Sequence, residues 1–151
     1  METKKIKIGD IRYVRATYEY VIIEDELTHR HAMLNFQKFA KLYYSTDDIN
    51  AAVEKVCLNQ EVVNFRQHIG GAWYVSVTSG FKCVDIRKYF MIDGQLKPTR
   101  IGIGLRMSEW ENLVKAIPSI HADRPDIAAT VPCYLREDHN NQQGEICNLL
   151  A

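Results

Sequence analysis

VDIRKYFMIDGQLKPTRIGIGLRMSEWENLVKAI, residues 84–117, is the stretch that decides the fold. It opens as a strand, because Val84 and Ile86 alternate with charged residues and so share one face. Asp93-Gly94 then marks a tight hairpin turn, since both residue types tolerate the positive φ that such turns need. A returning strand is predicted from Lys97-Pro98 onward, with alternating apolar residues Ile101, Ile103 and Leu105.

A helix is predicted after the returning strand. Ser108 can cap its N-terminus, with Glu111 reaching back to complete a capping box. Pro118 lacks the N–H that the next turn needs, so we expect the helix to end there. The apolar stripe of this helix consists of Met107, Trp110, Leu113, Val114 and Ile117.

Several features of this stretch occur together in one known family. They are a VDIR strand followed by an aromatic residue, a Lys-Pro hairpin, a Gly-Ile-x-Leu strand and a helix tryptophan, which stand here as Val84–Phe90, Gly94, Lys97-Pro98, Arg100, Gly102-Ile103, Leu105, Trp110 and Leu113. In this combination the stretch resembles the transcriptional positive cofactor 4 domain, a single-stranded DNA-binding module of eukaryotic coactivators. The resemblance implies a dimer whose strands form concave channels and whose helices form the interface.

Length, composition and charge limit the other possibilities. A chain of 151 residues supports one domain or two very small ones, and 46% apolar residues suffice for a packed core. The formal net charge is zero, which is not typical of proteins that bind nucleic acid through bulk charge. Any nucleic-acid site must therefore come from local clusters of charge, helped by aromatic stacking.

The spacing of the cysteines and the length of the apolar runs predict the cellular compartment of the protein. The four cysteines lie far apart without a CxxC pair, which favours reduced, intracellular thiols over a disulfide framework; they are Cys57, Cys83, Cys133 and Cys147. The N-terminal METKKIKIGDIRY lacks the apolar run of a signal peptide, and no run is long enough to span a membrane. We therefore expect a nuclear or cytoplasmic protein that is not secreted and has no membrane partner.

The first half of the chain predicts its own strands and helices. The strands are expected at Ile6–Ile8, twice within Ile11–Ile23, and at His29–Leu34. Val14 and Ala16 share one face, and Tyr13, Arg15 and Thr17 share the other. The acidic run Glu24–Glu26 is expected to be a solvated loop. Two helices follow, one with Phe36, Phe39, Leu42 and Tyr43 on one face, and one at Asp47–Val56 capped by Ser45 or Thr46.

The second half repeats this pattern after a link at Leu58–Asn64. Strands are predicted at Phe65–Ile69 and Trp73–Thr78, separated by the Gly70-Gly71 turn. In the second of these strands Val75 and Val77 face inward, whereas Tyr74, Ser76 and Thr78 face outward. The turn Ser79-Gly80 then leads into the stretch described first.

A faint internal repeat relates the two halves. A shift of 71 residues superposes Thr28 on Thr99, Ala32 on Ile103, Leu34 on Leu105, Phe39 on Trp110 and Leu42 on Leu113. We therefore predict an α+β fold of two β-β-β-β-α units: 1–60, a degenerate positive cofactor 4-like unit, and 61–120, a fuller one. They would pair as an intramolecular pseudo-dimer through Trp110, Leu113, Ile117, Phe39 and Leu42. The alternative is that both units merely obey the same patterning rules.

The C-terminal part from residue 121 to 151 is expected to be a tail. The pattern fades after Pro118, and Arg124-Pro125 and the polar run His139–Glu145 belong to no amphipathic face. We expect partly extended and partly disordered chain, in which Val131–Leu135 packs as an arm on the body or on a partner.

Catalytic and metal-binding motifs are absent from the sequence. It contains no Gly-rich phosphate loop, no HExxH and no Gly-x-Ser-x-Gly elbow, and Gly102–Gly104 is only a GxG. Two pairs, Cys133 with His139 and His29 with His31, lack a second pair at metal-site spacing. We therefore predict no enzymatic activity, no cofactor and no metal, although the sequence does not exclude a cysteine nucleophile.

Aromatic and basic residues recur on the outward faces of the predicted strands. Such surfaces bind single-stranded nucleic acid, because bases stack on the rings and cations hold the phosphates. The stacking candidates are Tyr13, Tyr74 and Phe90, and the phosphate candidates are Arg15, Arg87, Lys97 and Arg100. Ser76, which shares the outward face of its strand with Tyr74, is a further candidate. Taken singly, each tyrosine can equally pack on its own sheet, and each cation can simply be solvated.

The resemblance implies which of these residues contact DNA. In the family they are the arginine of the VDIR strand, the aromatic residue three positions later and the basic residues of the hairpin, here Arg87, Phe90, Lys97 and Arg100. The preceding hairpin is shorter in this chain, so Phe81 and Lys82 only approximate the family's residues. The first half lacks both motifs and ends its strand with Glu24–Glu26, which would repel phosphate. We therefore expect the second half to make most of the contact.

Two functions from different classes follow. The first, implied by the resemblance, is a non-enzymatic single-stranded DNA-binding protein acting in transcription or replication. Its partners would be single-stranded DNA or RNA, transcription or replication proteins, and a second copy of the chain unless the two units pair within one chain. The alternative is a protein-interaction or structural module that keeps the fold with weak or no nucleic-acid binding, which the neutral charge and the altered hairpin favour.

Overall fold

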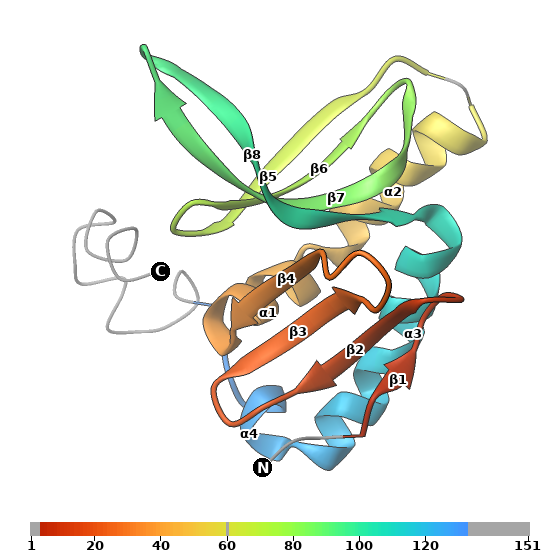
Figure 1. Cartoon of the computed structure of the whole chain (residues 1–151). Helices are drawn as coiled ribbons and strands as arrows, with labels where there is room; N and C mark the ends of the chain where they lie inside the picture. Colours follow the sequence, from red (N-terminus) through yellow and green to blue (C-terminus); the bar gives the residue numbers. More distant parts are fainter. Residues whose placement is uncertain (1–3, 60, 133–151) are drawn as a thin grey trace.

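The computed structural model describes residues 4–59 and 61–132, which form two four-stranded antiparallel sheets (Figure 1). The first sheet contains β1 (Ile6–Lys7), β2 (Arg12–Ala16), β3 (Tyr20–Asp25) and β4 (His31–Asn35), in that order. The second sheet contains β5 (Asn64–Gly70), β6 (Trp73–Thr78), β7 (Phe81–Ile92) and β8 (Gln95–Arg106), again in chain order. Helices α1 (Phe36–Tyr44) and α2 (Thr46–Cys57) follow the first sheet, and α3 (Met107–Asp123) and α4 (Pro125–Ala128) follow the second. The predicted α+β fold of two such units is confirmed.

The strand faces follow the alternation of the sequence. The inward residues Val14, Ala16, Val75 and Val77 are completely buried, because side chains two apart on a strand share a face. At the end of β7, Asp93-Gly94 forms the predicted turn with φ values of 51° and 77°. Alternation and turn chemistry were therefore sufficient to predict these strands.

A bulge interrupts the pairing of β7 with β8. The register jumps from Arg87 opposite Gly102 to Tyr89 opposite Pro98, so three residues of β8 lie opposite Lys88. Ile101 falls within this bulge and is 46% exposed, so it does not share the buried face of Ile103 and Leu105, as the predicted alternation required. Gly102 closes the bulge at φ +150°, where an added Cβ would clash with the carbonyl oxygen of Ile86.

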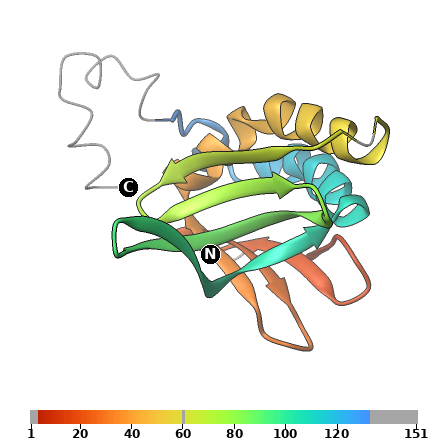
Figure 2. The same cartoon turned by 90° about the horizontal axis from the view of Figure 1, so that it is seen from above.

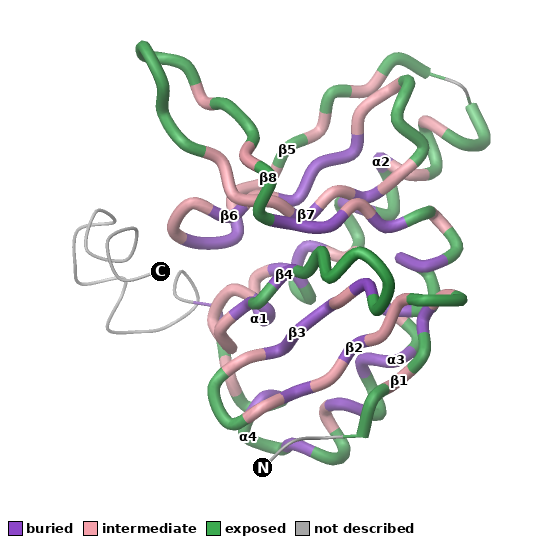
Figure 3. Tube along the Cα trace, in the orientation of Figure 1, coloured by how far each residue is buried: buried purple, intermediate pink, exposed green. Residues whose placement is uncertain are grey.

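Beyond the bulge, β7 and β8 continue as a two-stranded arm, residues 89–98. In Figure 1 the arm rises away from the rest of the second sheet, and Figure 3 shows most of it as exposed. Phe90, Met91 and Ile92 are all at least about half exposed there. The arm is therefore a projecting apolar feature of the surface.

Helix α3 differs from the prediction at both ends. It begins at Met107, and the carboxylate of Glu109, not Glu111, accepts a hydrogen bond from the N–H of Arg106 at 2.9 Å. The helix continues through Pro118, so the predicted end there is wrong. Pro118 removes one backbone hydrogen bond, but Ile117 and Ile120 on either side of it are fully buried, and their burial outweighs that loss.

The predicted stripe of α3 does face the core. Trp110, Leu113 and Ile117 are buried, and Met107 and Val114 pack partly against the same cluster.

The predicted caps of α2 have another role. The hydroxyls of Ser45 and Thr46 donate to the carbonyls of Lys41 and Tyr43, and so satisfy the end of α1 instead.

In the acidic run at the end of β3, only Glu26 lies in an exposed turn as predicted. Asp25 is only 2% exposed and accepts hydrogen bonds from the N–H groups of Leu27 and Thr28 and from Arg12 at 2.8 Å. Burial alone would raise the pKa of Asp25, but these hydrogen bonds outweigh it and lower the pKa below its ordinary value. Glu24 pairs with Arg15 at 2.9 Å. The prediction of a solvated loop is therefore wrong for Glu24 and Asp25, which belong to strand β3.

Arg12 also joins the two units. Besides Asp25, its guanidinium donates to the carbonyl oxygen of Gly104 in β8 and lies 3.4 Å from Glu109 in α3. A second polar link runs from the indole N–H of Trp110 to Asn50 in α2 at 2.8 Å. These contacts connect each half to the helices or strands of the other.

The core of the molecule is continuous across both units. Helix α3 packs on β2 as well as on β7 and β8, and α2 packs on β6 and β7. The four apolar pairs of the repeat are buried in both halves, whereas Thr28 is exposed and Thr99 is half-buried; the buried pairs are Ala32 and Ile103, Leu34 and Leu105, Phe39 and Trp110, and Leu42 and Leu113. The faint repeat in the sequence therefore corresponds to equivalent buried positions.

The first residues of the predicted tail are helical. Ile127 of α4 is buried, and Arg124 donates to the carbonyl of Thr17 at 2.8 Å and pairs with Asp126. Most of Val131–Leu135 and all of His139–Glu145 lie outside the described residues. Within residues 4–59 and 61–132, no helix is long and apolar enough to span a membrane.

Candidate nucleic-acid interface

The second sheet has one face packed on the helices and one face open. The packed face carries Val75, Val77, Val84 and Ile86, all fully buried. The opposite face, here called the open face, carries Arg66 and His68 from β5, Tyr74, Ser76 and Thr78 from β6, and Cys83, Asp85, Arg87 and Tyr89 from β7. Figure 2 shows the four strands as a curved layer with the helices on one side.

Three rings and a guanidinium form a cluster on the open face. The rings of His68 and Tyr74 lie 4.9 Å apart, and those of Tyr74 and Tyr89 lie 5.2 Å apart. The guanidinium of Arg66 lies over both tyrosines, 5.8 Å and 5.3 Å from their ring centroids. This ring cluster, Arg66, His68, Tyr74 and Tyr89, combines π faces with a positive charge from an exposed side chain.

The ring orientation of His68 is fixed by a backbone contact. Its Nε2 lies 2.7 Å from the carbonyl oxygen of Gly71 and therefore carries the donated proton. The contact ties the ring to the β5–β6 turn, and so places the cluster at the end of the sheet where β6 begins.

Beside the ring cluster, the open face is hollowed. The hollow has a volume of about 320 Å³ and is lined by Ser76, Thr78, Phe81, Cys83, Asp85, Arg87, Tyr89 and Pro98. Its lining combines two hydroxyls and a carboxylate with aromatic and apolar groups. A mixed lining of this kind suits a nucleobase, which has an apolar face and a polar edge.

Arg87 is held firmly at the floor of this hollow. Its Nε and Nη2 donate to the carboxylate of Asp85 at 2.9–3.2 Å, and its Nη1 donates to the carbonyl of Thr99 at 3.1 Å. The side chain is only 14% exposed. Asp85 thus compensates much of the charge that Arg87 would offer to a phosphate.

Cys83 lies in the same hollow as a neutral thiol. Burial raises the pKa of this thiol, and the negative charge of Asp85 raises it further, although Arg87 and Arg12 oppose the shift. In the part of the chain that the structure describes, no three His, Cys, Asp or Glu side chains converge as metal ligands. The rings, hydroxyls and carboxylate on this face are groups that can stack on a base or hydrogen-bond to it.

The structure brings only part of the predicted site together. Tyr74, Ser76 and Arg87 share the open face, and Phe81 lies at the rim of the hollow beside the exposed Lys82. The other predicted residues of this half lie on the arm or the bulge and include Phe90 and Lys97, which are directly opposite each other, and Arg100. Because side chains alternate, Phe90 points to the reverse side of the arm from Tyr89.

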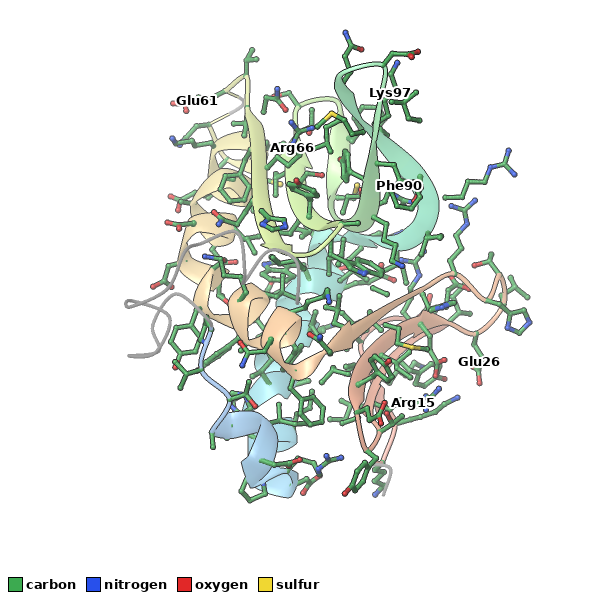
Figure 4. All side chains as sticks on the ribbon, turned by 90° about the vertical axis from the view of Figure 1, so that its left-hand side faces the viewer. Arg15, Glu26, Glu61, Arg66, Phe90 and Lys97 are labelled. Carbon is green, nitrogen blue, oxygen red and sulfur yellow. The ribbon has the colours of Figure 1, made fainter. Side chains whose placement is uncertain are left out.

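The predicted residues of the first half lie on a separate sheet. Figure 4 shows Arg15 and Glu26 there, well away from Arg66, Phe90 and Lys97. Arg15 pairs with Glu24, and the ammonium of Lys5 lies 5.1 Å from the ring of Tyr13. The structure therefore does not bring Tyr13 and Arg15 to the open face.

Three members of the ring cluster were not predicted from the sequence. Tyr89 follows Arg87 by two residues, so strand alternation alone could have placed it on the same face. Arg66 and His68 required the register of β5 on β6, in which they pair with Ser76 and Tyr74. The register between two strands cannot be predicted from the sequence of one strand alone.

Comparison with known proteins shows which family this region is similar to. Residues 74–116 match the family Transcriptional Coactivator p15 (PC4). The PC4 match extends from β6 to α3 and confirms the resemblance found in the sequence. It includes the hollow, the arm and the α3 stripe as far as Val114, whereas β5 with Arg66 and the whole first sheet lie outside it.

One curated relative supports the same assignment. A protein of Neurospora crassa, whose name describes an RNA polymerase II transcriptional coactivator, is 40% identical over 48 residues. Those residues are 32% of this chain and 28% of the relative, so most of each protein lies outside the similarity. The comparison with solved structures found no match.

Proposed function

We propose that the chain is a non-enzymatic protein of the nucleus that binds single-stranded DNA through the open face and acts in transcription. The observation that carries this proposal is the ring cluster, in which Arg66 lies over the adjacent rings of Tyr74 and Tyr89. The match of residues 74–116 to PC4 and the name of the Neurospora relative support the link to transcription.

The open face suits single strands rather than duplexes. A curved sheet with exposed rings accepts unpaired bases at about 1–3 kcal/mol each, and it offers no helix that could enter a groove. Exposed cations near it can hold the phosphates; they are Arg66, Lys82, Lys97 and Arg100. Because Asp85 compensates Arg87, this arginine would mainly shape the hollow for a base.

The two units would pair as an intramolecular pseudo-dimer. Supporting this are the contacts of Arg12 with Gly104 and of Trp110 with Asn50, which cross between the halves. The first sheet then takes the structural place of a second copy. Its cation Arg15 is engaged by Glu24, so we expect the second sheet to carry most of the nucleic-acid contact.

Binding of fluorescent oligo-dT at several salt concentrations tests the proposed function. The chain should bind the single strand more tightly than a duplex of the same length, with log K falling by about 0.7 per phosphate contact per unit of log salt. Equal affinity for both forms would contradict the proposal.

A second candidate is a protein-interaction module of the same fold. Two observations favour it: Asp85 engages Arg87, and the arm exposes Phe90, Met91 and Ile92. Absence of oligo-dT binding even at low salt would support this second candidate over the first.

A further inference from the structure

Two hydroxyl groups face the hollow on the open face. Ser76 and Thr78 lie two residues apart on β6, so their side chains share a face, and both line the hollow. Ser76 is only 9% exposed, and in the described part of the chain neither hydroxyl takes part in a hydrogen bond. A hydroxyl that is largely removed from water and has no partner is costly, so these groups are placed to bind a ligand.

A carboxylate lies directly across from the more buried hydroxyl. Asp85 on β7 is paired with Ser76, and residues paired in this way have Cβ atoms about 4.5–5.5 Å apart on one face of the sheet. Arg87 fixes the carboxylate from one side, because its Nε and Nη2 donate at 2.9–3.2 Å. A carboxylate has about four lone-pair sites, so these two donors leave about two sites for a ligand.

The next strand places no side chain beside this carboxylate. Asp85 is paired on its other side with Gly104 of β8, where an added Cβ would lie 3.5 Å from Oδ1 of Asp85 and 3.6 Å from Sγ of Cys83. Glycine at this position therefore leaves the carboxylate open on the side away from Ser76. Phe81 and Tyr89, further along β7 in both directions, add aromatic rings to the same lining.

These groups match the hydrogen-bonding edge of one nucleobase. Guanine has two adjacent donors on its Watson–Crick edge, N1–H and N2–H₂, followed by the acceptor O6. In adenine and cytosine the amino group is next to a ring nitrogen that accepts, and in thymine the N3–H lies between two carbonyl oxygens. A carboxylate repels those neighbouring acceptors, so guanine alone offers it two hydrogen bonds.

Resting on the proposed function, we infer that the hollow is a guanine-selective subsite on the path of the single strand. Asp85 accepts hydrogen bonds from N1–H and N2–H₂ of the base, and the hydroxyl of Ser76 or Thr78 donates to O6. Arg87 is a positioning residue, because it orients the carboxylate. The ring cluster beside the hollow accepts neighbouring bases of any kind, since every base has a π face.

The test varies one base in an otherwise constant single strand. An oligo-dT of about 12 nucleotides carries thymine, guanine, adenine, cytosine or hypoxanthine at one central position. The wild type should bind the guanine oligomer about tenfold more tightly than the thymine oligomer. Hypoxanthine is guanine without the 2-amino group, so it should lose most of that gain.

Matched variants locate the effect on the protein. Asp85→Asn is compared with Asp123→Asn, and Ser76→Ala with Ser108→Ala, where both control residues are exposed on α3. The ratio of guanine to thymine affinity should fall to about twofold in Asp85→Asn and to about threefold in Ser76→Ala, and it should stay near tenfold in both controls. Because Asp85→Asn releases the charge of Arg87, its affinity for oligo-dT should not fall.

The outcomes separate this inference from the proposed function. If the wild type binds the guanine and thymine oligomers equally, or if Asp85→Asn keeps the full ratio, the inference is overturned and the proposed function stands. If the wild type binds no single strand at all, the proposed function fails, and the inference fails with it.

Discussion

Replacing Tyr74 and Tyr89 together by alanine should weaken the binding of oligo-dT by at least about 30-fold, since each lost base stack costs about 1–3 kcal/mol. The two rings lie 5.2 Å apart at the centre of the open face, and Arg66 lies over both. Their removal therefore takes away the stacking surface and also the rings that position Arg66. Fluorescence anisotropy with the same oligomer measures the loss.

Two further variants separate loss of binding from loss of folding. Y74L/Y89L keeps apolar bulk on the strands but has no ring, so it should stay folded by circular dichroism and still lose affinity. Y13A/R15A makes an equivalent change on the first sheet, where Arg15 is already paired with Glu24, and should lose little. Equal losses for the Tyr74/Tyr89 and Tyr13/Arg15 variants would contradict the assignment of binding to the second sheet.

Trp110→Ala should lower the free energy of unfolding by about 3–5 kcal/mol, as for other large-to-small changes of buried aromatic residues. Trp110 is 2% exposed and lies in the middle of the α3 stripe, within a core that contains residues of both units. The substitution leaves a cavity and also removes the hydrogen bond to Asn50 in α2. Urea unfolding followed by circular dichroism measures the effect.

Trp110→Phe serves as the control for the cavity. It keeps one six-membered ring but removes the five-membered ring with its N–H, so the cavity is smaller than in Trp110→Ala. Asn50 is exposed and can bind water instead, so we expect a loss of about 1–2 kcal/mol. A change near zero in Trp110→Ala would show that the ring does not support the core, and Trp110 would then be a candidate contact for a partner.

The fold could be predicted from the sequence where the local pattern and the tertiary environment of a residue agree. Strand alternation at Val75 and Val77 and the Asp93-Gly94 turn required no long-range information, and both are found as predicted. The errors lie where distant residues intervene. Pro118 alone predicts a helix end, but α3 continues past it because Ile120 is buried. Asp25 alone predicts a solvated loop, but it is buried and hydrogen-bonded to Arg12.

The candidate site was readable only where the PC4 match covers it. Tyr74, Ser76 and Arg87 were predicted and share the open face. Arg66 and His68 join them through strand pairing, which a single sequence does not specify. The salt bridge between Asp85 and Arg87 is also a feature of three-dimensional geometry, and it changes the expected role of that arginine from phosphate contact to support of the hollow.

Ultraviolet crosslinking of oligo-dT to the full chain, followed by mass spectrometry of the peptides, tests most directly whether the open face holds the single strand. Thymine crosslinks should map to the ring cluster, with Tyr74, Tyr89 and His68 as the principal sites, and should fade as salt is raised. Crosslinks confined to the first sheet, residues 6–35, from an oligomer that is bound would contradict the account.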